Sequence, residues 1–566
     1  MGFGQRALLE GWRAVSNNRT DYSGHRLLAD SYSALPSHEL ARTSELLQSQ
    51  LLQPNNITPI QPHLGERNLA ILPGSGPTGA GFNEFNPLFS KNGFSLQTSG
   101  VIGSLDTYGD EVVHSGIWDK FSYSLGQFHH QTNGFRPNNK IDQNIYNAFI
   151  QGSPSEGLNI QAEYRHRDVT HGDLFYYGDL SQFSPKLTRH VNTDTYRIGM
   201  TINPTTNSNI LTSVTFLDHS DNVLNIVEGF NQYQKTQRGT LGEVQYNFKS
   251  DIYSLSMGGG GYAVDNGTLF KFGSFSLPRN FNTNYENFYL YNFINYPKDV
   301  TVTLGLSLDS IHNALVGSYN RTQINPKFGL LWQMDKSTTL RFAALRTLSR
   351  GLWVDSTIEP IQVAGFNQFF DSWPVTGAWR YGVGIDHKFS KSILVGAEVS
   401  KRDVVQPITN LPEFTVFLDK WEEKFLRGYF YWAINDYLAA NLEYQYDAVS
   451  NGGFSWYKNH IIPFSLRFFD HEYGFNASAT ITYVNQNALS PSSYTASDSS
   501  FGLLDLAMSY RLPNRLGVIK MQLKNALDKK FNFVGQNIAG QRSDRFEETP
   551  LFVPDRTFFV NFTLSF

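Results

Sequence analysis

Apolar and polar residues alternate along most of this chain, in segments of about ten residues that recur from residue 93 to the C-terminus. The final segment carries an apolar side chain at every second position: Phe558, Val560, Phe562, Leu564 and Phe566. Residues 158–167, 242–248 and 438–447 repeat the pattern. Side chains of a β-strand point alternately to its two faces, so this period of two predicts strands whose faces meet different surroundings.

The polar faces of these strands include charged residues. Five that we expect to face an interior are Glu163, Arg165, Arg167, Arg427 and Glu443. A dry protein core does not accept unpaired charges, so water meets the polar face and an apolar medium meets the other. The five charges are expected either to line a lumen and bias what passes, or to form a solvated wall without selectivity.

The lengths of the connections separate a membrane barrel from a soluble sandwich. Short turns are expected at 153–157, 204–208, 335–338, 390–392 and 512–515, and long loops at 168–193, 262–283, 347–377 and 525–554. Transmembrane barrels keep short turns on the periplasmic side and long loops outside. Ten short turns and eleven longer connections predict an all-β fold, an antiparallel transmembrane β-barrel of about 22 strands. Its first two strands are expected near 93–117, and both termini are expected in the periplasm.

Composition supports the barrel. Aromatic residues make up 14 % of the 566 residues and charged residues only 17 %, against about 25 % charged residues in an average soluble domain. Mean hydropathy is nevertheless −0.33, and no stretch reaches the roughly 18 apolar residues that a membrane helix needs. We therefore expect the strands to meet outer-membrane lipid, which places the protein in the outer membrane of a Gram-negative bacterium.

Charge and cysteine usage exclude other classes. A net charge of −4 gives no electrostatic basis for binding nucleic acid. The absence of cysteine excludes disulfides and thiolate metal sites. The first residues lack the apolar core and cleavage site of a secretory signal peptide, which an outer-membrane protein requires. We therefore expect a mature chain, a trimmed one, or the C-terminal part of a longer protein.

A different period marks the N-terminal residues, 1–52. Apolar residues recur there at helical spacing, first at Leu8, Leu9, Trp12 and Val15. Paired short helices of this size resemble the end of a tetratricopeptide repeat array, although a helical cap unrelated to any repeat gives the same pattern. Residues 53–92 are rich in Pro, Gly and Asn, which predicts an extended connector before the barrel at 93–566.

A barrel of this size needs an occluder. Twenty-two strands close into a ring about 44 Å in diameter, which would breach the envelope if left open. The connector is longer than is needed to join a helix to a strand. We therefore expect residues 53–92 to enter the lumen, together with the loop at 350–379.

Two stretches carry a resemblance to a known family. The terminal strand ends on an aromatic residue, and residues 525–531 read NALDKKF. The first resembles the signal read by the barrel assembly machinery. The second resembles the Asn-Leu-Phe-Asp-Lys-x-Tyr stretch of TonB-dependent outer-membrane receptors, whose barrels have 22 strands. The resemblance covers residues 93–566.

The resemblance implies passage of a solute or polymer across the outer membrane, with a periplasmic partner. Members of this family carry a globular plug and a short box gripped by an energy-transducing partner, and neither is recognisable in residues 1–92. Helices joined to such a barrel resemble receptor-like barrels fused to periplasmic tetratricopeptide domains, some of which export a polysaccharide or other polymer. A surface adhesion or structural barrel is a further alternative.

The loop at 350–379 is the most ligand-like segment. Its aromatic residues are Trp353, Phe366, Phe369, Phe370 and Trp373. Exposed aromatic rings among polar groups suit sugars or hydrophobic chelates. The same rings suit a loop that folds inward and packs as a constriction, and we favour this alternative because exposed apolar loops are a liability.

Metal and catalytic chemistry are not indicated. His129 and His130 are adjacent on a strand and face opposite ways, while His166, His171 and Asp173 have no recognised ligand spacing. No nucleophile is paired with a base, and no phosphate loop joins a strand to a helix. We expect no cofactor and no enzymatic activity.

Overall fold

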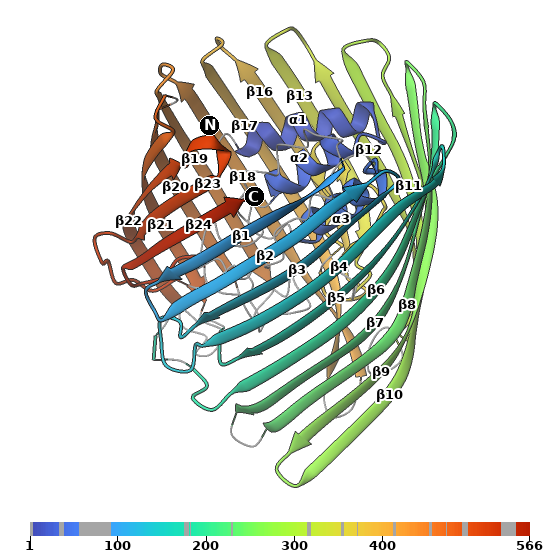
Figure 1. Ribbon diagram of the computed structural model, residues 1–566. Helices are drawn as coiled ribbons and strands as arrows, with labels where there is room; N and C mark the ends of the chain where they lie inside the picture. Colours follow the sequence, from blue (N-terminus) through green and yellow to red (C-terminus); the bar gives the residue numbers. More distant parts are fainter. Residues whose placement is uncertain are drawn as a thin grey trace.

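The computed structural model describes residues 4–32, 39–55, 92–174, 180–181, 183–227, 230–313, 319–351, 356–370, 372–410, 415–451, 456–470, 472–489, 496–533 and 551–566. Within these residues, 22 strands form one antiparallel sheet. The sheet closes because β1 (Gly93–Gly103) pairs with β24 (Thr557–Ser565) as well as with β2 (Thr107–Trp118). The predicted fold class is confirmed (Figure 1).

The remaining barrel strands follow in chain order. They are β3 Phe121–Thr132, β4 Ile141–Ser155, β5 Leu158–His171, β6 Thr188–Thr205, β7 Ser208–Val227, β8 Phe230–Lys249, β9 Tyr253–Phe272, β10 Phe275–Ile294, β11 Val300–His312, β12 Arg321–Gln333, β13 Thr338–Leu348, β16 Gly377–Lys388, β17 Ile393–Asn410, β18 Thr415–Ala433, β19 Leu438–Asn451, β20 Trp456–Asp470, β21 Phe475–Leu489, β22 Ala496–Arg511 and β23 Gly517–Lys524. A two-residue hairpin, β14 (Gln362–Val363) with β15 (Phe366–Asn367), lies in the connection after β13.

The two rims of the barrel differ in their connections. The rim that holds Phe566 has short turns, such as residues 156–157 between β4 and β5 and residues 206–207 between β6 and β7. We call it the short-turn rim. The opposite rim, the long-loop rim, holds the connections 349–376 and 525–556. The predicted asymmetry between short turns and long loops is confirmed at these positions.

One predicted loop is wrong. Residues 262–283 are not a connection, because β9 and β10 continue through them and are joined only by residues 273–274. The long hairpin is visible at the lower end of Figure 1. Similarly, the loop predicted at 168–193 shrinks to 172–187, between β5 and β6. Strands that leave the membrane meet water on both faces, so the alternation that marks a strand disappears there.

The outer surface of β7–β9 shows where the membrane ends. On β7 the outward side chains Ile210, Val214 and Phe216 are followed by Asp218. Asp218 pairs in register with Arg238 on β8, and Arg238 with Asp265 on β9, so one charged row crosses three strands. These strands have 20 residues each, whereas a membrane-spanning strand needs about 9–11. Strands β7–β9 therefore extend well beyond the lipid at the long-loop rim.

This boundary predicts a depth-dependent cost for an added charge. Val244 lies on the lipid face of β8 and is 49 % exposed. Val244→Arg is expected to lower the free energy of unfolding in lipid vesicles by about 2–4 kcal/mol, because it places a cation near the middle of the apolar band. Thr236→Arg, on the same face but beyond the charged row, is expected to cost less than about 1 kcal/mol. Equal losses in denaturant titrations of the two variants would contradict the assigned boundary.

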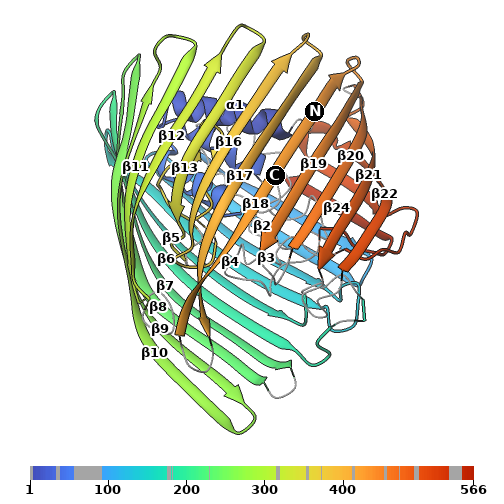
Figure 2. The same cartoon turned by 180° about the vertical axis from the view of Figure 1, so that it is seen from behind.

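The described residues that precede the barrel form α1 (Gly4–Asn17), α2 (Tyr22–Tyr32) and α3 (Glu39–Leu52). Within the described residues, no helix is long and apolar enough to cross a membrane. The three helices lie inside the ring of strands, as the opposite views in Figures 1 and 2 show. The predicted helical region is thus confirmed, and its likeness to tetratricopeptide repeats remains a prediction. The predicted connector lies almost entirely outside the described residues.

Apolar packing holds the helices against the inner wall. The apolar stripe of α1 and α2 is buried together with inward side chains of β8–β12: Leu8, Leu9, Trp12, Val15, Leu28 and Tyr32 pack in one cluster with Leu241, Tyr262, Val264, Tyr285, Ile311 and Leu331. Burying apolar surface from both sides stabilises the arrangement. Part of the barrel interior is therefore a protein core rather than a water-filled channel.

Candidate functional site

The helices are also tied to the wall by hydrogen bonds. We call residues 4–32 and 39–55 the helical plug. Near its C-terminal end, the backbone oxygens of Gln50 and Gln53 accept hydrogen bonds from the side-chain amides of Gln161 at 2.9 Å and Gln151 at 2.8 Å. The Thr201 hydroxyl donates to the backbone oxygen of Leu51 at 2.5 Å. The plug is therefore anchored on β4–β6.

The attachment of the plug lies at the short-turn rim. The Asn55 side-chain amide donates to the backbone oxygen of Lys120 at 3.0 Å, in the turn between β2 and β3. The Asn92 side-chain oxygen accepts from the backbone N–H of Asp119 in the same turn, at 2.8 Å. Residues 55 and 92, which flank the predicted connector, therefore lie beside neighbouring residues of one turn.

The connection 349–376, which we call the inner loop, folds into the barrel. Phe366 and Phe370 are each 1 % exposed, and Phe370 packs in the same cluster as α1 and α2. Phe369 is half-buried, and Trp373 packs against that cluster while remaining partly exposed. Trp353 lies outside the described residues. The prediction of an inward-folded constriction agrees with this packing, and a ligand-binding role for the five aromatic residues remains a prediction.

A buried arginine holds the inner loop in place. Arg350 is fully buried, and its guanidinium forms ion pairs with Glu359 and, at 3.5 Å, with Asp309 on β11. It also lies over the ring of Phe370, 4.3 Å from the ring centroid. Burial alone lowers the pKa of Arg350, but Tyr285, Asp309 and further acidic groups raise it above the usual value. Arg350 therefore remains charged inside the barrel.

A short chain of hydrogen bonds links the plug, the inner loop and the wall. The backbone N–H of Thr357 donates to the Ser44 hydroxyl on α3 at 3.0 Å. The Thr357 hydroxyl donates to the carboxylate of Glu243 on β8 at 2.5 Å. On the other side of the loop, the Gln362 amide donates to the Tyr32 hydroxyl of α2. The plug and the inner loop consequently form one packed unit.

The predicted lumen charges lie on the inner face and are largely paired. Arg427 on β18 and Glu443 on β19 form an ion pair at 2.6 Å. Glu163 on β5 pairs with Arg197 on β6 at 2.5 Å. Two further ion pairs lie on the inner face, Arg402 with Glu423 at 3.1 Å and Arg341 with Asp386 at 2.9 Å. Arg165 and Arg167 are half-buried on the same face of β5 as Glu163. A role of these residues in selectivity remains a prediction.

The histidines considered for metal binding are separated. His130 is buried in the interior, whereas His129 lies near Asp110 and Asp142 on the other face of β3. His166 pairs with Asp194 at 2.9 Å, and the Nδ1 atom of His171 bonds the backbone oxygen of Gly172 at 2.6 Å. In the described part of the chain, no group of three or more His, Cys, Asp or Glu side chains is placed to hold a metal ion.

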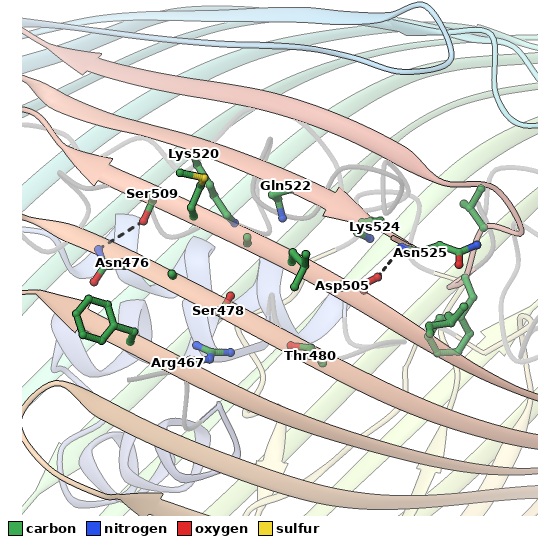
Figure 3. Close-up of a pocket in the computed structure, with 18 of the residues that line it drawn as sticks. Arg467, Asn476, Ser478, Thr480, Asp505, Ser509, Lys520, Gln522, Lys524 and Asn525 are labelled. Carbon is green, nitrogen blue, oxygen red and sulfur yellow. Dashed lines mark hydrogen bonds between the residues drawn. The ribbon is translucent and has the colours of Figure 1, made fainter. Parts of the chain in front are cut away.

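A polar cavity lies on the wall formed by β20–β23. It has a volume of about 640 Å³, and Figure 3 shows the polar side chains that line it. Those that carry charge or donate hydrogen bonds include Arg467, Ser478, Thr480, Lys520, Gln522 and Lys524. Small-molecule sites have volumes of about 300–1,000 Å³, and this cavity falls within that range.

Aromatic residues close the cavity toward the long-loop rim. Phe531 stacks on Phe501 of β22 with ring centroids 4.0 Å apart, and Phe552 packs edge-on against Phe533 at 5.1 Å. Residues 551–553 also line the cavity. The family-like stretch NALDKKF, residues 525–531, leads into this cap. Its turn is fixed by two hydrogen bonds of 2.9 Å between the Asn525 side chain and the backbone of Lys529.

Sequence reasoning missed Arg350 and this cavity. Lys520, Gln522 and Lys524 alternate on one face of β23, so their common inward orientation was recoverable from the period of two. Arg467 lies three strands away, and its placement beside them depends on the register of β20, β21, β22 and β23. The role of Arg350 depends on an inward fold of the loop that no local pattern specifies.

Solved structures share this architecture at low sequence identity. The copper transporter OprC matches with 10 % identity over 84 % of this chain and 80 % of its own, at a TM-score of 0.65. The FrpB iron transporter from Neisseria meningitidis matches with 12 % identity over 84 % and 82 %, at 0.63. The ferric-catecholate import receptor Fiu from Escherichia coli K12 matches with 12 % identity over the same shares, at 0.61.

The barrel has the fold of the TonB-dependent outer-membrane receptors. No family model and no curated protein matches the sequence. The resemblance inferred from the terminal strand and residues 525–531 is thus confirmed for the fold of the barrel. A receptor-like barrel with an apolar outer band agrees with the predicted outer-membrane location. The three proteins named are transporters or receptors, which agrees with the expectation of a protein that is not an enzyme.

Proposed function

We propose that this receptor-like barrel passes a solute across the outer membrane of a Gram-negative bacterium, without covalent chemistry. One observation carries the proposal. The helical plug and the inner loop pack against β4–β17, whereas the wall of β20–β23 retains a polar cavity. Three helices, each about 10 Å across, cannot fill a ring about 44 Å wide. The path of the solute is the part of the lumen beside β20–β23.

We propose further that the short-turn rim faces the periplasm, with both ends of the barrel there. Short turns lie on the periplasmic side of outer-membrane barrels, and Phe566 lies on that rim beside the start of β1, where its backbone N–H donates to Leu96 at 2.9 Å. A periplasmic partner would then meet the plug where Asn55 is bonded to the rim. A force applied at this point acts directly on the end of the plug.

The absence of cysteine allows a direct test of the path. We expect Ser478→Cys, in the cavity, to react with a bulky charged thiol reagent and to lose single-channel current in a planar bilayer. The loss follows because the added group narrows the passage. Ile481→Cys is the matched control, since Ile481 lies on the lipid face of the same strand and is 56 % exposed. It is expected to keep its current.

Two results would count against the proposed passage. One is a full-length protein that inserts into the bilayer and carries no current. The other is an unchanged current after Ser478→Cys has been labelled completely, as judged by mass spectrometry.

A further inference from the structure

Within the described residues, the inner wall carries ion-paired arginines on β17–β19 and cations without ion pairs on β20–β23. Over β16–β19, Arg402 and Arg427 each have a carboxylate partner within 3.1 Å. Over β20–β23, Arg467, Lys520 and Lys524 line one cavity. Within the described residues, none of these three cations forms an ion pair or a hydrogen bond. The buried Nε atom of Arg467 is among the donors left without a partner in this part of the chain.

Among the described residues that line the cavity there is one carboxylate, and it is committed elsewhere. Asp505 accepts a hydrogen bond from the backbone N–H of Asn525 at 2.8 Å, which fixes the start of the aromatic cap (Figure 3). It also attracts Lys524 electrostatically, although no ion pair joins the two side chains. In the described lining, three cations therefore share the cavity with one carboxylate, and that carboxylate already has a structural role. The three cations are half-buried, and charges without ion-pair partners are unfavourable there, so an anion that enters the cavity gains their combined attraction.

The spacing of the cations indicates the size of the anion. Arg467 on β20 and the lysines on β23 are separated by three strand spacings, or about 14 Å along the wall. Lys520 and Lys524 are four residues apart on one strand, which corresponds to about 13 Å. A single small ion cannot contact such distant groups together. The hydroxyls of Ser478 and Thr480 and the amide of Gln522 lie between them and offer neutral hydrogen-bond partners.

We propose that this cavity binds an extended organic anion that carries several carboxylate or phosphate groups along a hydroxyl-rich backbone. The cations hold the anionic groups, and the hydroxyls and the amide hold the groups between them. The inference deepens the proposed function, on which it rests, by naming the class of solute that passes.

The test is a binding measurement on the full-length protein in detergent, by isothermal titration calorimetry. The probes are trigalacturonate, tripolyphosphate and neutral maltotriose. Maltotriose is expected to bind far more weakly than either anion, and binding of the anions is expected to weaken with added salt. The first two probes separate a carboxylate ligand from a phosphate ligand, and tighter binding of either one identifies the source.

The variant that carries the test combines Arg467→Gln, Lys520→Gln and Lys524→Gln. Anion affinity is expected to fall about 100-fold, because several charge-assisted contacts are lost together. The matched control combines Lys336→Gln, Lys388→Gln and Lys391→Gln, three exposed lysines at the short-turn rim, and changes net charge equally. It is expected to bind normally. Retention of the heat-resistant folded band on gels verifies that both variants fold.

Either of two outcomes overturns the proposal: neither anion binds the unmodified protein, or the triple cavity variant binds as well as the rim control. Both are independent of the current measured for Ser478→Cys. If the barrel conducts but binds no anion, the proposed passage stands and the proposed anionic solute is refuted. If the barrel binds anions but carries no current, the anion site stands and the proposed passage is refuted.

Discussion

Deletion of residues 1–52 is expected to raise the single-channel conductance of the barrel by about threefold or more, because the plug helices occupy a large part of the ring. The contacts that hold them are inside the barrel: the apolar cluster with β8–β12 and the hydrogen bonds of Gln50 and Gln53 to the wall. Planar-bilayer recordings of the deleted and full-length proteins in the same salt measure the change.

A second deletion separates the helices from the connector as the occluder. Asn55 and Asn92 bond neighbouring residues of one turn, at Lys120 and Asp119. Residues 58–89 can therefore be replaced by a short Gly-Ser linker while the plug stays attached. Because the helices already lie inside the ring of strands, this variant is expected to conduct like the full-length protein, in contrast to the occluding role predicted from the sequence for residues 53–92. A rise in conductance after this replacement, and none after loss of residues 1–52, would assign occlusion to the connector instead.

Arg350→Met is expected to lower the free energy of unfolding by about 3–5 kcal/mol, the cost of breaking a buried ion pair by removing one partner. The substitution leaves Asp309 and Glu359 buried without their countercharge. The inner loop is also expected to loosen, which would increase current noise in single-channel recordings. Denaturant titration in lipid vesicles measures the change in stability.

Arg238→Met is the matched control for this substitution. Arg238 also pairs with an aspartate, Asp218 at 2.9 Å, but its side chain is 77 % exposed beyond the lipid. Exposed ion pairs contribute about 0–1 kcal/mol, so little change in unfolding is expected. If the two variants lost equal stability, Arg350 would not be the group that fastens the inner loop.

Alternation predicted the barrel well where lipid imposes it. On β5 and β19 the outward positions in the lipid are apolar, so the alternation in residues 158–167 and 438–447 was sufficient to predict these strands. Beyond the charged row on β9 and β10, lipid no longer requires the outward side chains to be apolar, so residues 262–283 looked like a loop. The sequence pattern therefore predicted these strands within the membrane and failed beyond its boundary.

The interior could be predicted only in part. The stripe of Leu8, Leu9 and Trp12 predicted helices, but the inward Leu241 and Tyr262 that receive them look like ordinary strand residues. The location of the helices therefore depends on packing between their apolar stripe and inward strand residues that are far away in the sequence. Glu443 and Arg427 were identified as inward from their period, whereas their pairing required the register of β18 with β19.

The adjacent positions of Asn55 and Asn92 also determine how far a released plug can move from the barrel. The 36 residues between them span roughly 120 Å when fully extended, which exceeds the height of a membrane about 40–45 Å thick. A plug expelled from the lumen would stay covalently tethered to the short-turn rim through residues 56–91. Its return would be a first-order event at millimolar effective concentration, so each opening can reseal without a second molecule.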